Sequence, residues 1–159
     1  MLVYLITHKN FSKNLIASGA AGRWNSEGKK VIYAAESIAL AFLENMVRRQ
    51  GIGPNSDFKI VVIEIPDDIN LSTLTTNDLK AGWRNFKDYY RCQPLGDEWY
   101  MQGATAVLKV PSAVLTESNN FVINTLHSDY VANKIKLIGI TNLLPDERLE
   151  QILKEYTQK

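Results

Sequence analysis

Three side chains in the first third of the chain have the chemistry to hold and activate a charged ligand. Arg23 lies between Gly22 and Trp24, Tyr33 follows it along the chain, and Glu44 comes after both. A glycine beside the arginine lets the backbone approach a ligand closely, and a guanidinium group matches the oxygens of a phosphate. These residue types therefore predict a ligand site made of a cation, an aromatic ring and a carboxylate.

Glu44 falls on the apolar side of a predicted helix. Residues 37–49 have helical spacing, with Ser37 as the N-cap and Gly51 as the stop. Glu44 is then at the centre of an arc of apolar residues, namely Leu40, Ala41, Leu43 and Val47. A charged group on this stripe is costly unless it is paired. Two interpretations remain open, an intrahelical pair with Arg48 or a carboxylate at the floor of a cleft.

Strand and helix patterns follow one another without regular alternation, which indicates an α+β fold. We expect a single domain over residues 1–159, with mixed or antiparallel central sheets and flanking helices. The predicted strands are 2–6, 31–34, 58–65, 105–110, 120–124 and 135–140. Short helical pieces are predicted at 77–83 and 97–101, a polar linker at 67–77, and an amphipathic helix that begins at Pro145 and Asp146 and carries Leu149, Ile152 and Leu153.

Composition excludes several classes of function. The net charge is +1 and no block of lysine and arginine occurs, so direct nucleic-acid binding has no electrostatic basis. No apolar run is long enough for a membrane span and the first residues do not form a signal peptide, so we expect no membrane association. The single cysteine, Cys92, fits a reducing cytosol, and a cytoplasmic location is expected. Two histidines and one cysteine do not make a zinc site, so no metal is expected.

Other candidate residues have ordinary structural explanations. His8 and His127 have no nucleophile near them in the sequence, and Cys92 is interpreted as a packing residue. The sequence contains no phosphate-binding glycine loop, no Gly-x-Ser-x-Gly elbow and no His-Glu-x-x-His motif. The tryptophans are expected to be core or lid anchors, and these are Trp24, Trp83 and Trp99.

Four separated motifs in order resemble the RES-domain family over roughly residues 2–150. They are Gly22-Arg23-Trp24-Asn25, the strand with Tyr33, the helix with Leu43-Glu44, and the later run from Gly96-Asp97-Glu98-Trp99 through 106–114 to Asn120-Phe121-Val122-Ile123-Asn124. The resemblance implies Arg23, Tyr33, Glu44 and Ser112 as catalytic residues, and Arg23, Tyr33 and Asn124 as residues that bind the nucleotide. Two departures are visible: Leu5 or Ile6 stands where many members have arginine, and Thr125 where many have proline.

The resemblance also implies a fold similar to ADP-ribosyltransferase toxins and an activity on NAD. Members of this family resemble the toxins of bacterial RES–Xre toxin–antitoxin pairs, which break the bond between nicotinamide and ribose. NAD would be the substrate, with no cofactor, and hydrolysis or phosphorolysis would deplete it. An alternative is transfer of ADP-ribose to a cellular protein, and a third is a catalytically silent module that only binds an antitoxin.

The residue types suit this chemistry. Nicotinamide in NAD is a cationic leaving group that needs no general acid, so one carboxylate suffices to stabilise charge on the ribose. Glu44 is expected in that role. Arg23 is expected to bind the phosphates and to act as a charge partner for Glu44. Tyr33 is expected to contact the nicotinamide ring or the ribose, and Ser112 either to hydrogen-bond the ribose or to orient Glu44. Loops at 50–57 and 80–95 are expected to select the acceptor. The resemblance implies an Xre-type antitoxin that supplies DNA binding and plugs the cleft near Glu44.

Overall fold

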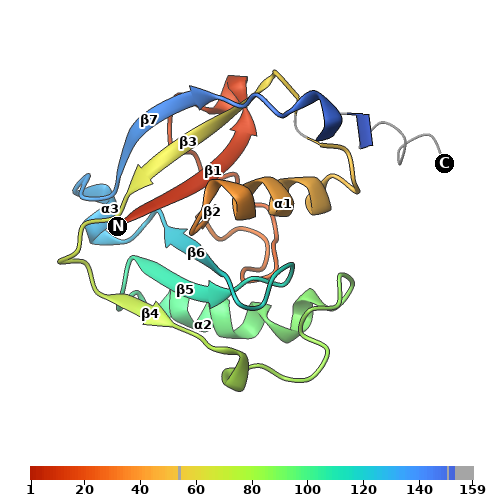
Figure 1. Cartoon of the computed structure of the whole chain (residues 1–159). Helices are drawn as coiled ribbons and strands as arrows, with labels where there is room; N and C mark the ends of the chain where they lie inside the picture. The colour runs from red at the N-terminus through yellow and green to blue at the C-terminus, as the bar shows by residue number, and fades with distance from the viewer. Residues whose placement is uncertain (54, 150, 153–159) are drawn as a thin grey trace.

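The computed structural model describes residues 1–53, 55–149 and 151–152. Its centre is a seven-stranded sheet with the strand order β4-β5-β6-β2-β1-β3-β7 (Figure 1). The β4–β5 pair is parallel, and the other neighbouring pairs are antiparallel. The strands are β1 (Leu2–His8), β2 (Val31–Ala35), β3 (Phe58–Glu64), β4 (Leu71–Thr73), β5 (Val107–Pro111), β6 (Asn119–Asn124) and β7 (Lys136–Asn142). The helices are α1 (Ile38–Arg48), α2 (Gln93–Gln102) and α3 (Ser128–Val131). The structure thus has the α+β architecture expected from the sequence.

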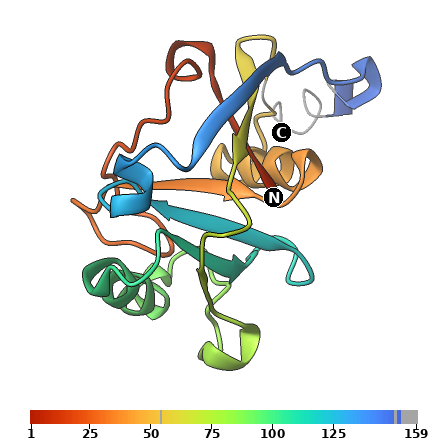
Figure 2. The ribbon, with the colours of Figure 1, turned by 90° about the vertical axis from the view of Figure 1, so that its left-hand side faces the viewer.

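The sheet divides between its two central strands. β1 pairs with β3 along its whole length, from Leu2 opposite Glu64 to His8 opposite Phe58. In contrast, β1 and β2 are paired at one position, Tyr4 opposite Ala35. Beyond this point the two strands separate, so the sheet consists of a β1–β3–β7 half and a β2–β6–β5–β4 half (Figures 1 and 2).

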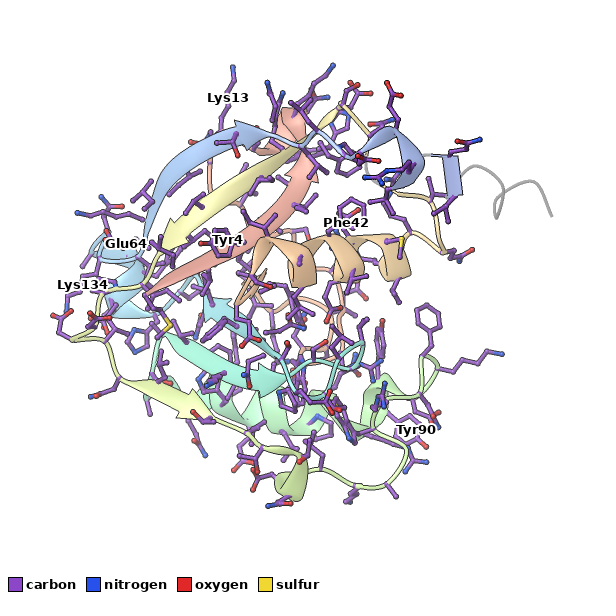
Figure 3. The ribbon with its side chains drawn as sticks, in the orientation of Figure 1. Tyr4, Lys13, Phe42, Glu64, Tyr90 and Lys134 are labelled. Carbon is purple, nitrogen blue, oxygen red and sulfur yellow. The ribbon has the colours of Figure 1, made fainter. Side chains whose placement is uncertain are left out.

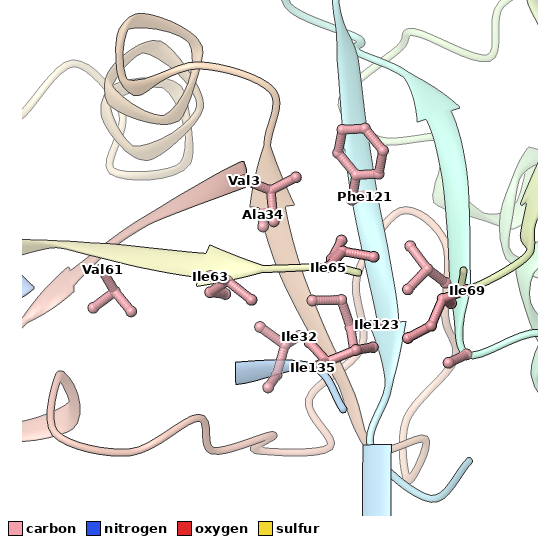
Figure 4. Packing of buried hydrophobic residues seen from close by; sticks show 12 residues of the cluster. Val3, Ile32, Ala34, Val61, Ile63, Ile65, Ile69, Phe121, Ile123 and Ile135 are labelled. Carbon is pink, nitrogen blue, oxygen red and sulfur yellow. The ribbon is translucent and has the colours of Figure 1, made fainter. Parts of the chain in front are cut away.

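Alternate side chains of the strands contribute to different cores, because successive residues of a strand point to opposite faces. On one face, Val3 packs with Ile63, Ile65 and Ile123 in a large apolar cluster (Figure 4). On the other face, Ile6 packs with Leu40 and the rest of the α1 contact. A third cluster lies between α2 and the β5–β6 pair and contains the three tryptophans, which are all buried: Trp24, Trp83 and Trp99. Their predicted role as core residues is confirmed.

Helix α1 begins and ends where the sequence indicates. The Ser37 side chain accepts a hydrogen bond from the Leu40 N–H at 3.1 Å, which makes Ser37 the N-cap. At the other end Gln50 and Gly51 both have positive φ, and the Gly51 N–H bonds the Met46 carbonyl at 2.9 Å. The predicted helix, with its N-cap and its glycine stop, is confirmed.

Two segments differ from the prediction. Residues 77–83 are not a helix: a 3₁₀ turn covers Thr76–Asp78, and Gly82 adopts a φ of +80°, which a helix does not allow. The segment predicted as a polar linker contains β4, which is only three residues long and carries one leucine, too short a pattern to recognise. Residues 147–149 and 151–152 are helical as predicted, and the rest of the predicted segment, including Leu153, lies outside the described residues.

No helix in the described part of the chain is long and apolar enough to cross a membrane.

Candidate active site

A cavity of about 470 Å³ lies where β1 and β2 separate. Its walls come from β1, the 18–24 segment, β2, α1, the 84–89 segment and the turn after β5. Among the lining residues are Tyr4, Leu5, Ile6, Gly22, Arg23, Trp24, Tyr33, Glu44, Asn45, Arg48, Arg84, Phe86, Tyr89, Ala113, Val114 and Asn120. The volume is within the usual range for small-molecule sites. Arg23, Tyr33 and Glu44, predicted together from the sequence, line this one cavity.

Glu44 is half-buried on α1, and two side chains hold it. Both donate to the same oxygen: Ser112 Oγ is 2.7 Å from Glu44 Oε1, and Asn120 Nδ2 is 2.5 Å from it. The other oxygen, Oε2, makes no hydrogen bond to another described residue, so it is available to a ligand. Glu44 is therefore an oriented carboxylate with one oxygen uncommitted.

Backbone N–H groups fix the orientation of the Ser112 hydroxyl. Its Oγ accepts hydrogen bonds from the N–H groups of Val114 and Leu115, at 3.0 and 3.1 Å. Because these bonds occupy the lone pairs, the hydroxyl proton is directed to Glu44. Ser112 has no exposed surface and does not line the cavity. Of the two roles left open by the sequence, contact with ribose or orientation of Glu44, the geometry favours the second.

Asn120 is a site residue that sequence reasoning missed. It is the first asparagine of its strand, paired across β5–β6 with Val110, two residues before Ser112. The pairing of β5 with β6 brings it beside Ser112, and the sequence signal for this neighbourhood is that the strands predicted at 105–110 and 120–124 follow one another along the chain. Asn124, the residue expected to bind the nucleotide, is at the other end of β6, where its Oδ1 accepts the Leu126 N–H at 3.0 Å. Asn124 is buried and does not line the cavity.

Arg23 lies at the cavity wall with its guanidinium group bound to backbone. It donates to the carbonyls of Trp83, Arg84 and Asn85, the last two at 3.2 and 3.4 Å. Its guanidinium carbon also lies 4.8 Å from the centre of the Tyr89 ring, a cation–π distance. Arg23 thus holds the 83–89 segment against the cavity.

Neither ion pair considered for Glu44 is present among the described residues. Arg48 lines the cavity one turn after Glu44 and forms no ion pair with it. Arg23 does not pair with Glu44 either, because the 83–85 carbonyls take its donors. The predicted arc was also incorrect at its edge, since Val47 is 43% exposed and the buried side of α1 is formed by Leu40, Ala41 and Asn45. Glu44 is at the border of that side and faces the cavity.

Tyr33 fixes the loop that carries Arg23. Its hydroxyl donates to Asn25 Oδ1 at 2.6 Å and accepts the Trp24 N–H at 3.0 Å. Burial raises the pKa of this phenol well above its ordinary value, so it stays a neutral donor. A Cβ at Gly22 would lie 2.6 Å from the Tyr33 hydroxyl, which explains the glycine before Arg23. Because the hydroxyl both donates and accepts within the protein, a ligand would contact Tyr33 through its ring.

Helix α2 supports the same loop from the other side. Gln93 Nε2 donates to the carbonyl of Gly22 at 2.9 Å, and Asp97 accepts the Ser26 N–H at 2.9 Å. Gly96 allows the closest approach, because a Cβ there would lie 1.8 Å from the Trp24 carbonyl oxygen. The Gly96-Asp97 motif therefore acts through the loop of Arg23 and does not itself line the cavity.

The cavity is basic and aromatic. Three arginines line it against the single carboxylate of Glu44, and these are Arg23, Arg48 and Arg84. Aromatic rings come from several elements, namely Tyr4, Trp24, Tyr33, Phe86 and Tyr89. Tyr4 projects from β1 beside α1, where Phe42 also packs (Figure 3). Such a lining suits a ligand that has negative charge and flat rings.

Only one of the two loops predicted to select the acceptor lines the cavity, among the residues that the structure describes. The 80–95 segment reaches the cavity through Arg84, Phe86 and Tyr89, while none of the described residues of 50–57 lines it. The exposed Tyr90 marks the outer side of the first segment (Figure 3). Acceptor selection therefore stays a prediction for 80–95 alone.

The lone histidines and the cysteine have structural roles. His8 Nδ1 accepts the Asn10 N–H, and His127 Nδ1 accepts the Asp129 N–H at the start of α3. Cys92 has no exposed surface, and burial raises the pKa of its thiol. Within the described residues no group of three or more histidine, cysteine or acidic side chains is arranged to hold a metal ion.

Comparison with known proteins identifies the family. The family model described as the RES domain matches residues 3–149. The chain belongs to the RES-domain family. Its curated relatives include "Toxin Res" of Yersinia enterocolitica, 31% identical over 82% of this chain and 87% of the relative. Another relative is the "Prs ADP-ribosylating toxin" of Sphingobium sp., 35% identical over 80% of each chain.

A solved structure confirms the fold of this RES-domain protein. A chain of the M. tuberculosis MbcT–MbcA toxin–antitoxin complex superposes with a TM-score of 0.70, covering 99% of this chain and 89% of that one. The sequence identity is 17%, so the likeness concerns the fold. The resemblance to RES domains found in the sequence motifs is confirmed by the family model, and the solved structure agrees with the fold that the resemblance implies.

Proposed function

We propose that this RES-domain chain is the toxin of a bacterial toxin–antitoxin pair and that it cleaves the nicotinamide–ribose bond of NAD. The observation that carries the proposal is the oriented Glu44 carboxylate, which has one uncommitted oxygen at a cavity lined by arginines and aromatic rings. The toxin names of the curated relatives support the biological role.

The proposed reaction needs only one carboxylate. Nicotinamide leaves as a neutral molecule with the electron pair of the glycosidic bond, and positive charge develops on the ribose. Glu44 stabilises that charge, which is typically worth ~3–4 kcal/mol for one well-placed group. Water or phosphate then bonds to the first carbon of the ribose and loses a proton. The aromatic wall of Tyr33 receives the nicotinamide ring, and the basic lining of the cavity favours the negative charge of the pyrophosphate.

The test is incubation of the purified protein with NAD, with and without phosphate, followed by chromatography of the products. We expect free nicotinamide in both cases, with ADP-ribose from hydrolysis or its phosphate ester from phosphorolysis. Glu44→Gln should lower the rate about 100-fold or more while the circular dichroism spectrum stays unchanged. Absence of nicotinamide release by the unmodified protein would contradict the proposal.

A second candidate is transfer of ADP-ribose to a cellular protein. It is favoured by the name of the Sphingobium relative, which is the more similar of the two curated relatives described above. The same ribosyl cation would then be captured by a side chain of the acceptor protein. Incubation with labelled NAD and a bacterial lysate distinguishes the two, because transfer leaves label on a protein band and hydrolysis leaves it on a small molecule.

We further propose a protein antitoxin as the partner, of the Xre type, which supplies the DNA binding. An enzyme that consumes NAD must be restrained in the cell that makes it, and this chain has a net charge of only +1 and no basic block for DNA. The neighbouring structure is a toxin–antitoxin complex, which agrees with such a partner. Inhibition by a segment inserted into the cavity toward Glu44 is the expected mode.

A further inference from the structure

Arg84 is an exposed arginine of the cavity lining whose guanidinium group is anchored to the backbone and keeps one nitrogen uncommitted among the described residues. Its Nε donates to the Ala113 carbonyl at 3.0 Å, and its Nη2 lies 3.5 Å from the Val114 carbonyl. Its Nη1 makes no hydrogen bond to another described residue, and no carboxylate of the described residues forms an ion pair with it. Arg23, in comparison, uses both terminal nitrogens on backbone carbonyls.

The position of Arg84 is set by two parts of the site. Arg23 binds the carbonyls of residues 83–85 and so fixes the backbone on which Arg84 stands. Ala113 and Val114, which anchor its side chain, belong to the turn whose Ser112 hydroxyl holds Glu44. The guanidinium group is therefore held at a defined place relative to the carboxylate, which is what positioning of a long substrate requires.

Arg84 also lies between two hollows. Besides the cavity of Glu44, an open hollow of about 590 Å³ is lined by residues 81–85 and Ala113. Arg84 and Ala113 belong to both linings. A ligand that fills the cavity with one end and extends into the second hollow would run along the wall that the two share, which is formed by Arg84 and Ala113.

We propose that Arg84 binds the pyrophosphate of the dinucleotide substrate and that Arg23 is the positioning residue that orients the segment carrying it. This inference rests on the proposed function and names a further binding residue for it. The nicotinamide riboside half occupies the cavity of Glu44, the pyrophosphate lies on Arg84 Nη1, and the second half of the dinucleotide extends over the outer hollow. The free Nη1 supplies two donors to phosphate oxygens.

The first test measures binding without turnover. Calorimetric titration with ADP-ribose should give a dissociation constant about 10-fold or more higher for Arg84→Gln than for the unmodified protein, as for a lost hydrogen bond between charged groups. Arg84→Lys should be intermediate, since it keeps the charge and loses the anchored fork. Arg148→Gln is the matched control, because Arg148 is an exposed arginine outside the cavity that pairs with Asp146. Equal affinity of Arg84→Gln and Arg148→Gln for ADP-ribose would overturn the proposal.

Kinetics separates this inference from the proposed function. In phosphate-free buffer, Arg84→Gln should raise the KM for NAD by about 10-fold or more with kcat nearly unchanged, and the KM should depend less on salt than in the unmodified protein. If the unmodified protein binds ADP-ribose through Arg84 but releases no nicotinamide, the proposed reaction fails and the binding residue stands. If Arg84→Gln alters only the KM for added inorganic phosphate, Arg84 belongs to an acceptor site and the inference is wrong.

A double-mutant cycle tests the role of Arg23. Arg23→Lys removes the planar group that binds three carbonyls, so it should weaken ADP-ribose binding and reduce the further effect of Arg84→Gln. Coupling between the two substitutions is expected because Arg23 acts through the segment that bears Arg84. Independent, additive effects on the dissociation constant would overturn the positioning role. Melting temperatures of all variants show whether a loss of binding is a loss of folding.

Discussion

A carboxylate that stabilises developing positive charge must be ionised and must keep one oxygen for the substrate. Ser112 and Asn120 both donate to Oε1 of Glu44, so the two hydrogen bonds orient the carboxylate and leave Oε2 uncommitted. This division of the two oxygens explains how one glutamate on the border of a buried helix face is tolerated. In this arrangement Glu44 is the group proposed to act on the substrate, and Ser112 and Asn120 are the groups that orient Glu44.

At the residue scale, Ser112→Ala should lower kcat for NAD cleavage about 10-fold and leave the KM nearly unchanged. The substitution removes one hydrogen bond that orients Glu44, and Ser112 does not line the cavity. Steady-state kinetics on purified protein gives both parameters. Thr116→Ala, in the same loop and away from the cavity, is the control and should leave both unchanged. A rise in KM at constant kcat would place Ser112 on the substrate.

Asn120→Asp tests the hydrogen bond that orients Glu44 from β6. The new side chain would place an oxygen where Asn120 Nδ2 is now, 2.5 Å from Glu44 Oε1, so a donor would be replaced by an acceptor. Asn120→Asp should therefore lower kcat for NAD cleavage about 10-fold or more, as measured by steady-state kinetics on purified protein. Asn120→Ala removes the donor without placing an oxygen beside the carboxylate, and should lower kcat less. An unchanged kcat in Asn120→Asp would contradict the role of Glu44.

At the element scale, the loop of Arg23 is formed by its neighbours more than by its own sequence. Tyr33 of β2 binds it through Asn25 and Trp24, and α2 binds it through Gln93 and Asp97. The loop has one internal bridge, between Gly22 and Asn25. Its geometry therefore depends on the packing of α2 and β2, and a change in α2 should reach the cavity.

Gly96→Ala is the direct test of that dependence. A Cβ at Gly96 would be 1.8 Å from the Trp24 carbonyl oxygen, so α2 or the loop must shift. We expect an unfolding free energy lower by ~1–3 kcal/mol and a weaker affinity for ADP-ribose. Gly139→Ala is the matched control, because its Cβ would lie 3.6 Å from Val62, an ordinary contact. Denaturant melts and calorimetry measure the two effects, and equal behaviour of the two variants would show that the approach of α2 is unimportant.

At the scale of the whole molecule, the site exists because the sheet is divided. The cavity lies where β1 and β2 separate, and it is lined by residues of β1, β2, α1 and the 84–89 segment. The core clusters pack on both sides of this place and hold the two halves of the sheet together.

Expression of the chain alone in a bacterium should arrest growth and lower cellular NAD. A Glu44→Gln variant expressed at the same level should do neither, because the cleavage step is lost. Co-expression of an antitoxin encoded beside the toxin should restore growth and NAD together. Growth curves and an enzymatic NAD assay on extracts measure these outcomes. Arrest with unchanged NAD and a labelled ADP-ribosylated protein would favour the transferase.

The sequence alone determined much of this protein. Alternation and β-branched residues predicted six of the seven strands, and the Ser37 cap and Gly51 stop predicted α1, because these signals are local. The order of the motifs indicated the family, and through it Arg23, Tyr33, Glu44 and Ser112. Local signals do not report which distant groups meet, so the contact of Asn120 with Glu44 is absent from the prediction, while Asn124 came from the resemblance as a nucleotide-binding residue.

Only the tertiary structure decided how the site residues are used. Ser112 and Asn120 donate to Glu44 because folding brings the ends of β5 and β6 to the side of α1 that carries Glu44. Arg23 donates to the 83–85 carbonyls and forms no ion pair with Glu44. These contacts join residues about 60 or more positions apart, and hydrogen-bond geometry over such separations depends on the packing of whole elements. The sequence specifies which chemical groups are present, and the packing of α1, α2 and the divided sheet specifies which of their atoms remain free for a ligand.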